Sequence, residues 1–185
     1  MLYVYFRGCA RMLEALLVID VQMAMFDPRD PVWGGEQLLN QIAYLIEEAR
    51  KKQVLVVYVQ HDGPPGSPLD PHSAAHAIHP RVAPQIGDPI VHKTTPDSFY
   101  RTPLDQWLRG HGVDKLVITG IQTEICIDAT CKSAVSHDYA VTLAGDAHST
   151  WGRESLSAET IVAHHNSVIG EWFGRVARSK DLWQG

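Results

Sequence analysis

Residues 117–130 read VITGIQTEICIDAT, and this stretch decides the fold. An apolar strand runs into a glycine turn and then into a helix that carries Cys126 near its start. The positive end of a helix dipole, free backbone N–H groups and any neighbouring cation would each lower the pKa of this thiol. The sequence therefore makes Cys126 a candidate nucleophile. The alternative is a small buried hydrophobic residue, which is the commoner role of a free cysteine.

On both sides of this stretch, apolar runs alternate with segments of helical period. The expected strands are residues 15–19, 54–59, 89–91, 115–119 and 139–144, with a short edge strand at 175–177. The expected helices are residues 38–52, 102–110 and 124–137, and one more within 154–170. Thr102 is the expected N-cap of the second helix and Thr123 that of the third. Strands that alternate with helices predict βαβ units. We therefore expect a three-layer, doubly wound α/β domain, in which a mostly parallel sheet of five or six strands has helices on both faces.

Length and composition limit what kind of protein this is. With 185 residues, 45% of them hydrophobic, the chain suffices for a single domain, which we place at residues 14–185 after an N-terminal extension at residues 1–13. An alternative start at Met12 stays open. No apolar run is long enough to span a bilayer, so we expect no membrane partner. A net charge of −5 without a basic stripe argues against nucleic acid. Three cysteines are too few for a disulfide framework, which favours a cytoplasmic protein.

Three chemically active residues stand at the ends of expected strands. Asp20 ends the first strand, Lys93 ends the third, and Cys126 follows the fourth. Ligands of doubly wound sheets bind at the carboxyl ends of the strands, near the point where the strand order reverses. Each residue alone has an ordinary explanation, as a turn former, a solvated charge or a core residue. Together they place a base, a cation and a nucleophile at the edge where function is expected.

These residues lie in segments that resemble a known family. The matching segments are LLVIDVQ at 16–22, VYVQHDG at 57–63, Lys93 with Ser98-Phe99, GIQTEIC at 120–126 and GDAHST at 145–150. From about Glu14 to the C-terminus, the chain resembles the cysteine hydrolases of the isochorismatase-like superfamily. Relatives in that group include nicotinamidases, N-carbamoylsarcosine amidohydrolases and ureidoacrylate or maleamate amidohydrolases.

The resemblance implies a role for each of these residues. Asp20 would be the general base, Lys93 the cation that holds the thiolate, and Cys126 the nucleophile that attacks an amide carbonyl. The backbone N–H groups of Gln122 and Cys126 would form an oxyanion hole, next to a cis peptide bond between Ile121 and Gln122. The expected reaction is hydrolysis of a C–N bond in a small amide or ureide through a thioester acyl-enzyme, without a cofactor. Relatives are commonly oligomeric, so we also expect a homo-oligomer.

The substrate pocket and the metal content are less well determined by the sequence. We expect Phe26, Gln60, His79 and Phe99 to line the pocket, although core packing explains the two phenylalanines as well. The irregular segment 61–89 is expected to form a lid or pocket wall, with a plain surface loop as the alternative. Zinc-dependent nicotinamidases carry an Asp-x-His pair where this chain has QHD at 60–62, so we expect no metal. Whether the histidines of the 61–89 segment bind a metal stays open.

Other reactions and roles remain as alternatives. Isochorismatases proper cleave a vinyl ether and lack the cysteine, so Cys126 favours C–N hydrolysis. A thiol oxidoreductase would use Cys126 with Cys131, but five residues along a helix turn the two thiols apart, and there is no Cys-x-x-Cys. A noncatalytic binding protein with the same fold would have an unreactive Cys126, whereas a hydrolase would show rapid alkylation of this thiol at neutral pH.

Overall fold

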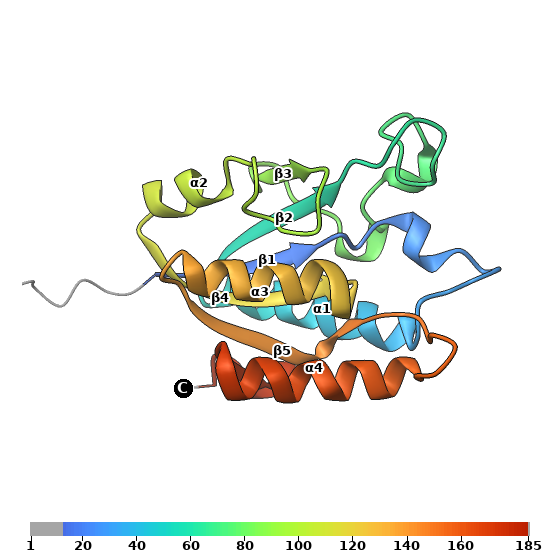
Figure 1. Cartoon of the computed structure of the whole chain (residues 1–185). Coiled ribbons are helices and arrows are strands. Elements are labelled where there is room, and N and C mark those ends of the chain that lie inside the picture. Colours follow the sequence, from blue (N-terminus) through green and yellow to red (C-terminus); the bar gives the residue numbers. More distant parts are fainter. Residues whose placement is uncertain (1–12, 185) are drawn as a thin grey trace, which may run out of the picture.

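Six strands form one sheet in the order β3-β2-β1-β4-β5-β6, and every neighbouring pair is parallel (Figure 1). The computed structural model describes residues 13–184. The predicted N-terminal extension, with Cys9, lies outside the described residues except for Leu13. The strands are β1 (Leu13–Ile19), β2 (Leu55–His61), β3 (Ile90–Lys93), β4 (Val113–Ile121), β5 (Ala140–Ser149) and β6 (Arg175–Ala177). The α-helices are α1 (Gly35–Lys51), α2 (Leu104–Gly110), α3 (Asp128–Ser136) and α4 (Ala158–Trp172). The three-layer α/β fold is therefore confirmed.

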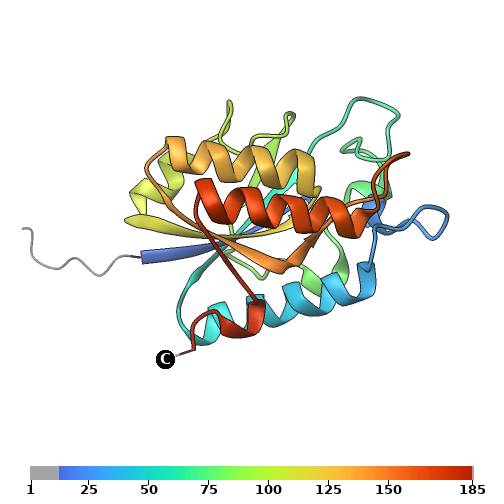
Figure 2. The ribbon, with the colours of Figure 1, turned by 60° about the horizontal axis from the view of Figure 1, so that its bottom comes forward.

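Alternate residues of the central strands supply two separate cores. Along β1, Leu17 and Ile19 pack with residues of α2, α3 and α4, whereas Leu16 and Val18 pack with residues of α1. Figure 2 shows α3 and α4 on one side of the sheet and α1 on the other. A strand covered on both faces must be apolar throughout, which explains the uninterrupted run in the sequence. Each fully buried leucine contributes about 1.5–3 kcal/mol by leaving water.

The closest approach of two strands depends on Gly120. Its φ is 127°, and a Cβ built on it would lie 2.0 Å from the carbonyl oxygen of Ile19. Only glycine allows this conformation and this contact between β4 and β1. The turn glycine of the sequence is thus a strand residue that brings β4 against the end of β1, where Asp20 follows.

The fifth strand is longer than the sequence predicts. It continues past residue 144 to Ser149, and its pairing with β4 shifts register between Ile118 and Gly120. The polar residues in this part have distant partners. Asp146 Oδ1 accepts hydrogen bonds from the N–H and the hydroxyl of Ser179, at 2.7 and 2.6 Å. The polar residues of this segment are typical of a loop in the local sequence. They fit inside a strand because distant residues form hydrogen bonds with them.

Two helix starts also differ from the prediction. A π-helical turn, η4 (Thr123–Ile127), precedes α3, and its N-cap is Gln122 instead of Thr123. Thr123 is buried, and its hydroxyl lies 2.9 Å from Nδ1 of His148. Helix α2 has Pro103 at its N-cap, one residue later than predicted, and the N–H of Leu104 still donates to the Thr102 hydroxyl at 3.3 Å.

Loops from two parts of the chain gather at the carboxyl edge of the sheet. The segment after β1 carries the 3₁₀ turn η1 (Met23–Phe26), and the segment after β2 carries η2 (Ala74–His76) and η3 (Pro80–Val82). Figure 1 shows both segments beyond the same ends of the strands. An antiparallel bridge joins Gln22 to Ile78. Among residues 13–184, the structure contains no helix with the length and apolar character needed to cross a membrane.

Candidate active site

Asp20 and Lys93 form a buried ion pair across the carboxyl ends of β1 and β3, with β2 between these two strands. Asp20 follows β1 with a φ of 52°, and its backbone N–H donates to the carbonyl of Val59 at 2.9 Å. Lys93 ends β3, and its Nζ lies 2.6 Å from Asp20 Oδ2. Both side chains are almost completely buried. Two charges withdrawn from water in this way are tolerated when they pair closely, and such pairs commonly mark functional sites.

The thiol of Cys126 completes this group. Cys126 lies in η4 with 8% of its surface exposed, and its Sγ is 3.4 Å from Lys93 Nζ. The remaining oxygen of the aspartate, Asp20 Oδ1, is buried and has no hydrogen-bond partner among the described residues. The structure thus brings together the three residues that the sequence predicts as catalytic. It leaves one carboxylate oxygen without a partner beside the thiol.

The surroundings of Cys126 raise the pKa of its thiol, whereas the sequence features alone would lower it. Burial, followed by the charge of Asp20, raises the pKa of Cys126 to about 12, while Lys93 opposes the rise. Burial also raises the pKa of the Asp20 carboxyl, although Lys93 acts in the opposite direction. A helix N-terminus and a cation are visible in the sequence, but the desolvation of the pocket is not. A reaction at this thiol would therefore require a nearby base.

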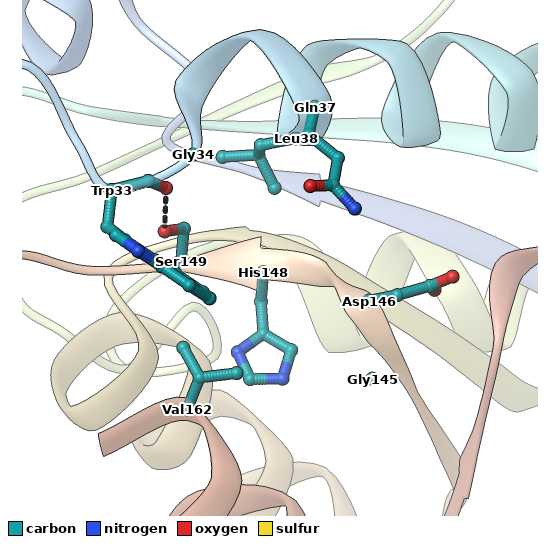
Figure 3. A pocket seen from close by; sticks show the side chains of 9 residues that line it. All are labelled: Trp33, Gly34, Gln37, Leu38, Gly145, Asp146, His148, Ser149 and Val162. Carbon is teal, nitrogen blue, oxygen red and sulfur yellow. Dashed lines mark hydrogen bonds between the residues drawn. The ribbon is translucent and has the colours of Figure 1, made fainter. Parts of the chain in front are cut away.

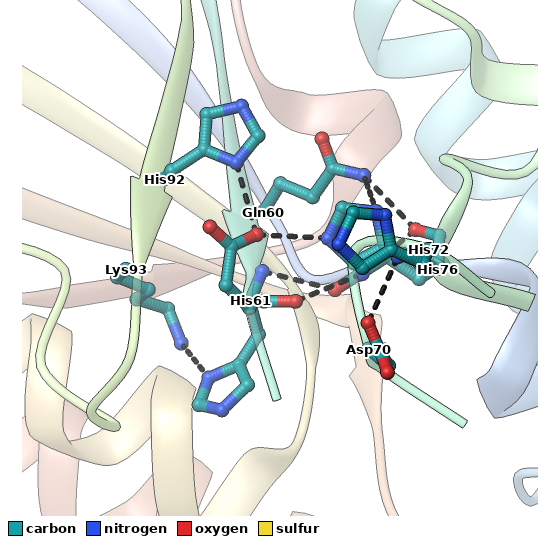
Figure 4. Close-up of polar contacts among 9 residues, drawn as sticks. Gln60, His61, Asp70, His72, His76, His92 and Lys93 are labelled. Carbon is teal, nitrogen blue, oxygen red and sulfur yellow. Dashed lines mark hydrogen bonds and ion pairs between the residues drawn. The ribbon is translucent and has the colours of Figure 1, made fainter. Parts of the chain in front are cut away.

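His61 belongs to the same group, although the sequence analysis did not select it. Its Nδ1 lies 3.2 Å from Lys93 Nζ (Figure 4). Ligand atoms of Asp20, His61 and Cys126 all lie within 4.8 Å of one another. Burial and the nearby Lys93 lower the pKa of His61. His61 ends β2, just as Lys93 ends β3. The same argument that selected Asp20, Lys93 and Cys126, a reactive side chain at the carboxyl end of a strand, could therefore have selected His61.

The segment between β4 and Cys126 is held by side chains on both sides. The peptide bond between Ile121 and Gln122 is cis, at the position that the resemblance implies. The Gln122 amide donates to Glu124 Oε1 at 2.9 Å and to the Thr150 hydroxyl at 3.0 Å. Arg153 Nη2 binds the same Glu124 oxygen at 2.9 Å. These contacts fix the backbone that would supply the oxyanion donors.

With this geometry established, comparison with known proteins places the chain. A model of the isochorismatase domain matches residues 14–167. The chain belongs to the isochorismatase family. It is 34% identical over 164 residues to a streptothricin hydrolase of Streptomyces noursei, covering 88% of this chain and 65% of that protein. It therefore spans less than two thirds of that relative.

Two further relatives agree with the family assignment. A ureidoacrylate amidohydrolase of Methylobacterium radiotolerans is 29% identical over 198 residues, which cover 88% of this chain and 76% of that protein. The crystal structure of a cysteine hydrolase from Pseudomonas syringae superposes with a TM-score of 0.86 at 26% identity, covering 91% of this chain and 90% of that one. The family fold therefore extends over nearly the whole described chain.

In this member of the isochorismatase family, the four predicted pocket residues lie in different surroundings. Phe26 borders a groove of about 640 Å³ between residues 23–29 and 66–75. His79 is the N-cap of η3, and its ring lies 4.9 Å from that of Phe26. Gln60 is buried, and its amide donates to the carbonyl of His76 at 2.9 Å, which ties β2 to the 61–89 segment. Phe99 packs in the core and stacks on the ring of His137.

Two groups of described residues have the types and spacing of metal ligands. One is Asp20, His61 and Cys126, but the ammonium of Lys93 already lies among these atoms. The other is Asp62, His76 and His92, where Asp62 Oδ1 lies 2.8 Å from His76 Nε2 and 3.0 Å from His92 Nδ1. Figure 4 labels the two histidines. Hydrogen bonds from the two rings to one carboxylate oxygen account for this arrangement.

A smaller cavity of about 220 Å³ lies between the start of α1 and β5 (Figure 3). Its lining includes Trp33, Gln37, Asp146, His148 and Ser149. The Ser149 hydroxyl donates to the carbonyl of Trp33 at 2.6 Å, which joins β5 to the residues before α1. Asp20, Lys93 and Cys126 are not among its lining residues, so we do not assign it to the reaction.

Proposed function

We propose that this chain is a cysteine-dependent amidohydrolase that cleaves a C–N bond of a small amide or ureide through a thioester. The observation that carries the proposal is the position of Lys93 Nζ, which lies 2.6 Å from Asp20 Oδ2 and 3.4 Å from Cys126 Sγ inside the protein. A base, a cation and a thiol in direct contact are the parts that nucleophilic attack on an amide requires.

In the acylation step, Asp20 Oδ1 takes the proton of Cys126 as Sγ bonds to the substrate carbonyl carbon. The high pKa of the thiol makes this transfer part of the attack, and Lys93 stabilises the sulfur as its negative charge develops. The backbone N–H groups of Gln122 and Cys126 receive the carbonyl oxygen as it becomes negative. Asp20 then returns the proton to the nitrogen, the C–N bond breaks, and ammonia or an amine leaves.

Water completes the reaction. Asp20 removes a proton from water, whose oxygen attacks the thioester carbonyl, and the carboxylic acid leaves as Cys126 regains its proton. Each oxyanion donor typically contributes about 10²–10³ to the rate, and positioned proton transfer contributes about 10²–10⁴. The chemistry requires no redox cofactor.

The names of two relatives support the substrate class. One is a ureidoacrylate amidohydrolase, and the other is a streptothricin hydrolase. The chemistry at Cys126 supports C–N hydrolysis over vinyl ether cleavage, because a thioester needs an acyl group. A thiol oxidoreductase would need Cys131 to be accessible and readily deprotonated. Cys131 is fully buried, and this burial raises the pKa of its thiol, which argues against that alternative.

The test is a screen for ammonia release over small amides and ureides, with Cys126→Ala and Cys131→Ala assayed in parallel. We expect Cys126→Ala to lose about a thousandfold or more of kcat/KM while keeping the fold, since the nucleophile is removed. Cys131→Ala is the matched control and should retain turnover. An undiminished rate in Cys126→Ala would contradict the proposed mechanism.

We also propose a homo-oligomer in a reducing compartment such as the cytoplasm. Trp172 on α4 is 78% exposed, and a large apolar side chain at the surface suits a subunit contact. The nucleophile must remain a free thiol, which a reducing compartment ensures. Light scattering of the purified chain tests the assembly, and a monomer at all concentrations would exclude it.

A further inference from the structure

His61 is placed against the reacting atoms by strand pairing. It ends β2, and its partner in the parallel register is Lys93 at the end of β3. Its Nδ1 lies 3.2 Å from Lys93 Nζ, and one of its ring nitrogens lies within 4.8 Å of Cys126 Sγ. The side chain is partly buried, so one part of the ring meets the protein while another part stays accessible.

The contact with Lys93 fixes the proton on the other ring nitrogen. An ammonium group has donors only, so a hydrogen bond in this contact runs from Lys93 to an unprotonated Nδ1, beside the contacts of Nζ with Asp20 Oδ2, the Thr95 carbonyl and Cys126 Sγ. A neutral imidazole then carries its proton on Nε2. The groups around the ring are Lys93, Asp20, Asp62, His76 and Cys126, and their combined effect with burial is to lower the pKa of His61 and keep the ring neutral at pH 7. His61 Nε2 has no hydrogen-bond partner in the described part of the chain.

The order of the strands indicates which part of a substrate this N–H meets. In the proposed reaction, the carbonyl oxygen faces the backbone of Gln122 and Cys126 after β4, and the leaving nitrogen faces Asp20 after β1. His61 follows on the next strand, β2. The third substituent of the carbonyl carbon is the acyl chain, and in this arrangement it would extend toward His61 on β2.

We propose that His61 is a specificity-determining residue whose Nε2–H binds a hydrogen-bond acceptor on the acyl chain, close to the scissile carbonyl. This assignment rests on the proposed amidohydrolase function. It restricts the substrate class to amides that carry a second carbonyl, a carboxylate or a comparable acceptor one or two bonds from the reacting carbon. An all-hydrocarbon acyl chain would cover this donor without pairing it, which lowers binding in the transition state.

The tautomer is tested directly by NMR of the full chain labelled with ¹⁵N-histidine, with the His61 signals assigned by their loss in His61→Leu. We expect a neutral ring protonated on Nε2 at pH 7. A ring protonated on Nδ1, or on both nitrogens, would overturn the inference whether or not the chain hydrolyses amides.

The specificity is tested with acetoacetamide and butyramide, which differ by a carbonyl in place of a methylene group. In wild type, the ratio of their kcat/KM values should exceed that in His61→Leu by about tenfold, the effect of one hydrogen bond. Comparing the ratio between variants cancels the intrinsic reactivity of the two amides. His92→Leu is the control, because His92 contacts Asp62 and is more than half exposed.

Two conservative variants distinguish binding of the substrate by His61 Nε2–H from the hydrogen bond between His61 Nδ1 and Lys93. Gln places an N–H near the position of Nε2, so His61→Gln should keep the wild-type preference. Asn places its oxygen near Nδ1, so His61→Asn should accept from Lys93 but lose the preference. An unchanged ratio in His61→Leu would overturn the assignment of His61 alone, whereas hydrolysis that survives in Cys126→Ala would overturn the proposed function.

Discussion

The two carboxylate oxygens of Asp20 have different surroundings. Oδ2 accepts from Lys93 at 2.6 Å, whereas Oδ1 is buried without a partner among residues 13–184. A buried carboxylate oxygen without a partner is costly, which favours uptake of a proton at this oxygen. Burial raises the pKa of this carboxyl in the same direction. In the proposed mechanism, this oxygen is the acceptor for the proton of Cys126.

Replacing Asp20 by Asn should slow the alkylation of Cys126 by iodoacetamide about a hundredfold at pH 7, because the loss of the base outweighs the lower thiol pKa that follows when the charge of Asp20 is removed. In wild type, the carboxylate form is the active one and its pKa is raised, so the rate should fall as pH drops through a midpoint above 3.8. The measurement is the rate of modification of the Cys126 peptide by mass spectrometry.

The matched control for this substitution is Asp138→Asn. Asp138 is exposed and also has a positive φ, 63° against 52° for Asp20, so both variants lose one charge at a similar backbone conformation. We expect Asp138→Asn to alkylate at the wild-type rate. Equal rates in the two variants would remove Asp20 from the mechanism.

Gly120 is the residue on which the approach of β1 and β4 depends. A Cβ there would lie 2.0 Å from the Ile19 carbonyl oxygen, so Gly120→Ala should lower the free energy of unfolding by about 4 kcal/mol or more. Gly110→Ala at the end of α2 is the control, since nothing lies within 4 Å of the added atom, and we expect a gain of up to about 1 kcal/mol. Urea denaturation of both variants distinguishes the two outcomes.

At the scale of elements, one buried histidine joins three of them. His148 in β5 lies 2.9 Å from the Thr123 hydroxyl in η4 and 2.9 Å from Asn166 Oδ1 in α4. The amide oxygen accepts only, so Nε2 carries the proton and Nδ1 accepts from the threonine. Burial lowers the pKa of His148 to about 4. The turn that carries Cys126 is thus held by a ring that must stay neutral.

This link predicts how stability depends on pH. The pKa of His148 is about 4 in the fold, below its ordinary value of 6.5, so the unfolded chain binds the proton more tightly. The contribution of neutral His148 to the free energy of unfolding is fully present above pH 6.5. It is lost as pH falls toward 4, and the total loss is about 3 kcal/mol. His148→Gln should remove about 1.4 kcal/mol per pH unit from the slope of unfolding free energy in this window. His111→Gln, at an exposed position, should leave the slope unchanged.

The elements and the site were predictable to different degrees. Strand positions followed from apolar runs, because a strand covered on both faces must be apolar, and the strand-end argument brought Asp20, Lys93 and Cys126 together. The end of β5 was missed because Asp146 and His148 are satisfied by residues distant in sequence. The raised pKa of Cys126 was missed because burial is a property of the whole fold.

At the scale of the molecule, the strand order explains where the site lies. The chain builds the sheet outward from β1 through β2 to β3, and then returns to start again at β4 on the other side of β1. Helix α1, which follows β1, and helix α3, which follows β4, pack on opposite faces of the sheet, and ligands of doubly wound sheets bind at such a point between two strands. Asp20 stands on one side of this point and Cys126 on the other.

The two cores on opposite faces of the sheet should separate stability from activity. Leu45 in α1 is completely buried in the core that α1 shares with the sheet, whereas Cys126 packs in the core on the other face. Leu45→Ala should therefore lower the free energy of unfolding by about 2–5 kcal/mol while kcat/KM of the folded enzyme is unchanged. Urea denaturation and ammonia release measure the two quantities.

The neighbouring residue in α1 offers the control for this last experiment. Tyr44 is 37% exposed and belongs to neither core, so Tyr44→Ala should lower the free energy of unfolding by less than Leu45→Ala, although it removes more atoms. If Leu45→Ala reduced kcat/KM at temperatures where the variant is folded, the α1 core would be coupled to the site. The sheet would then transmit changes in packing from one face to the other.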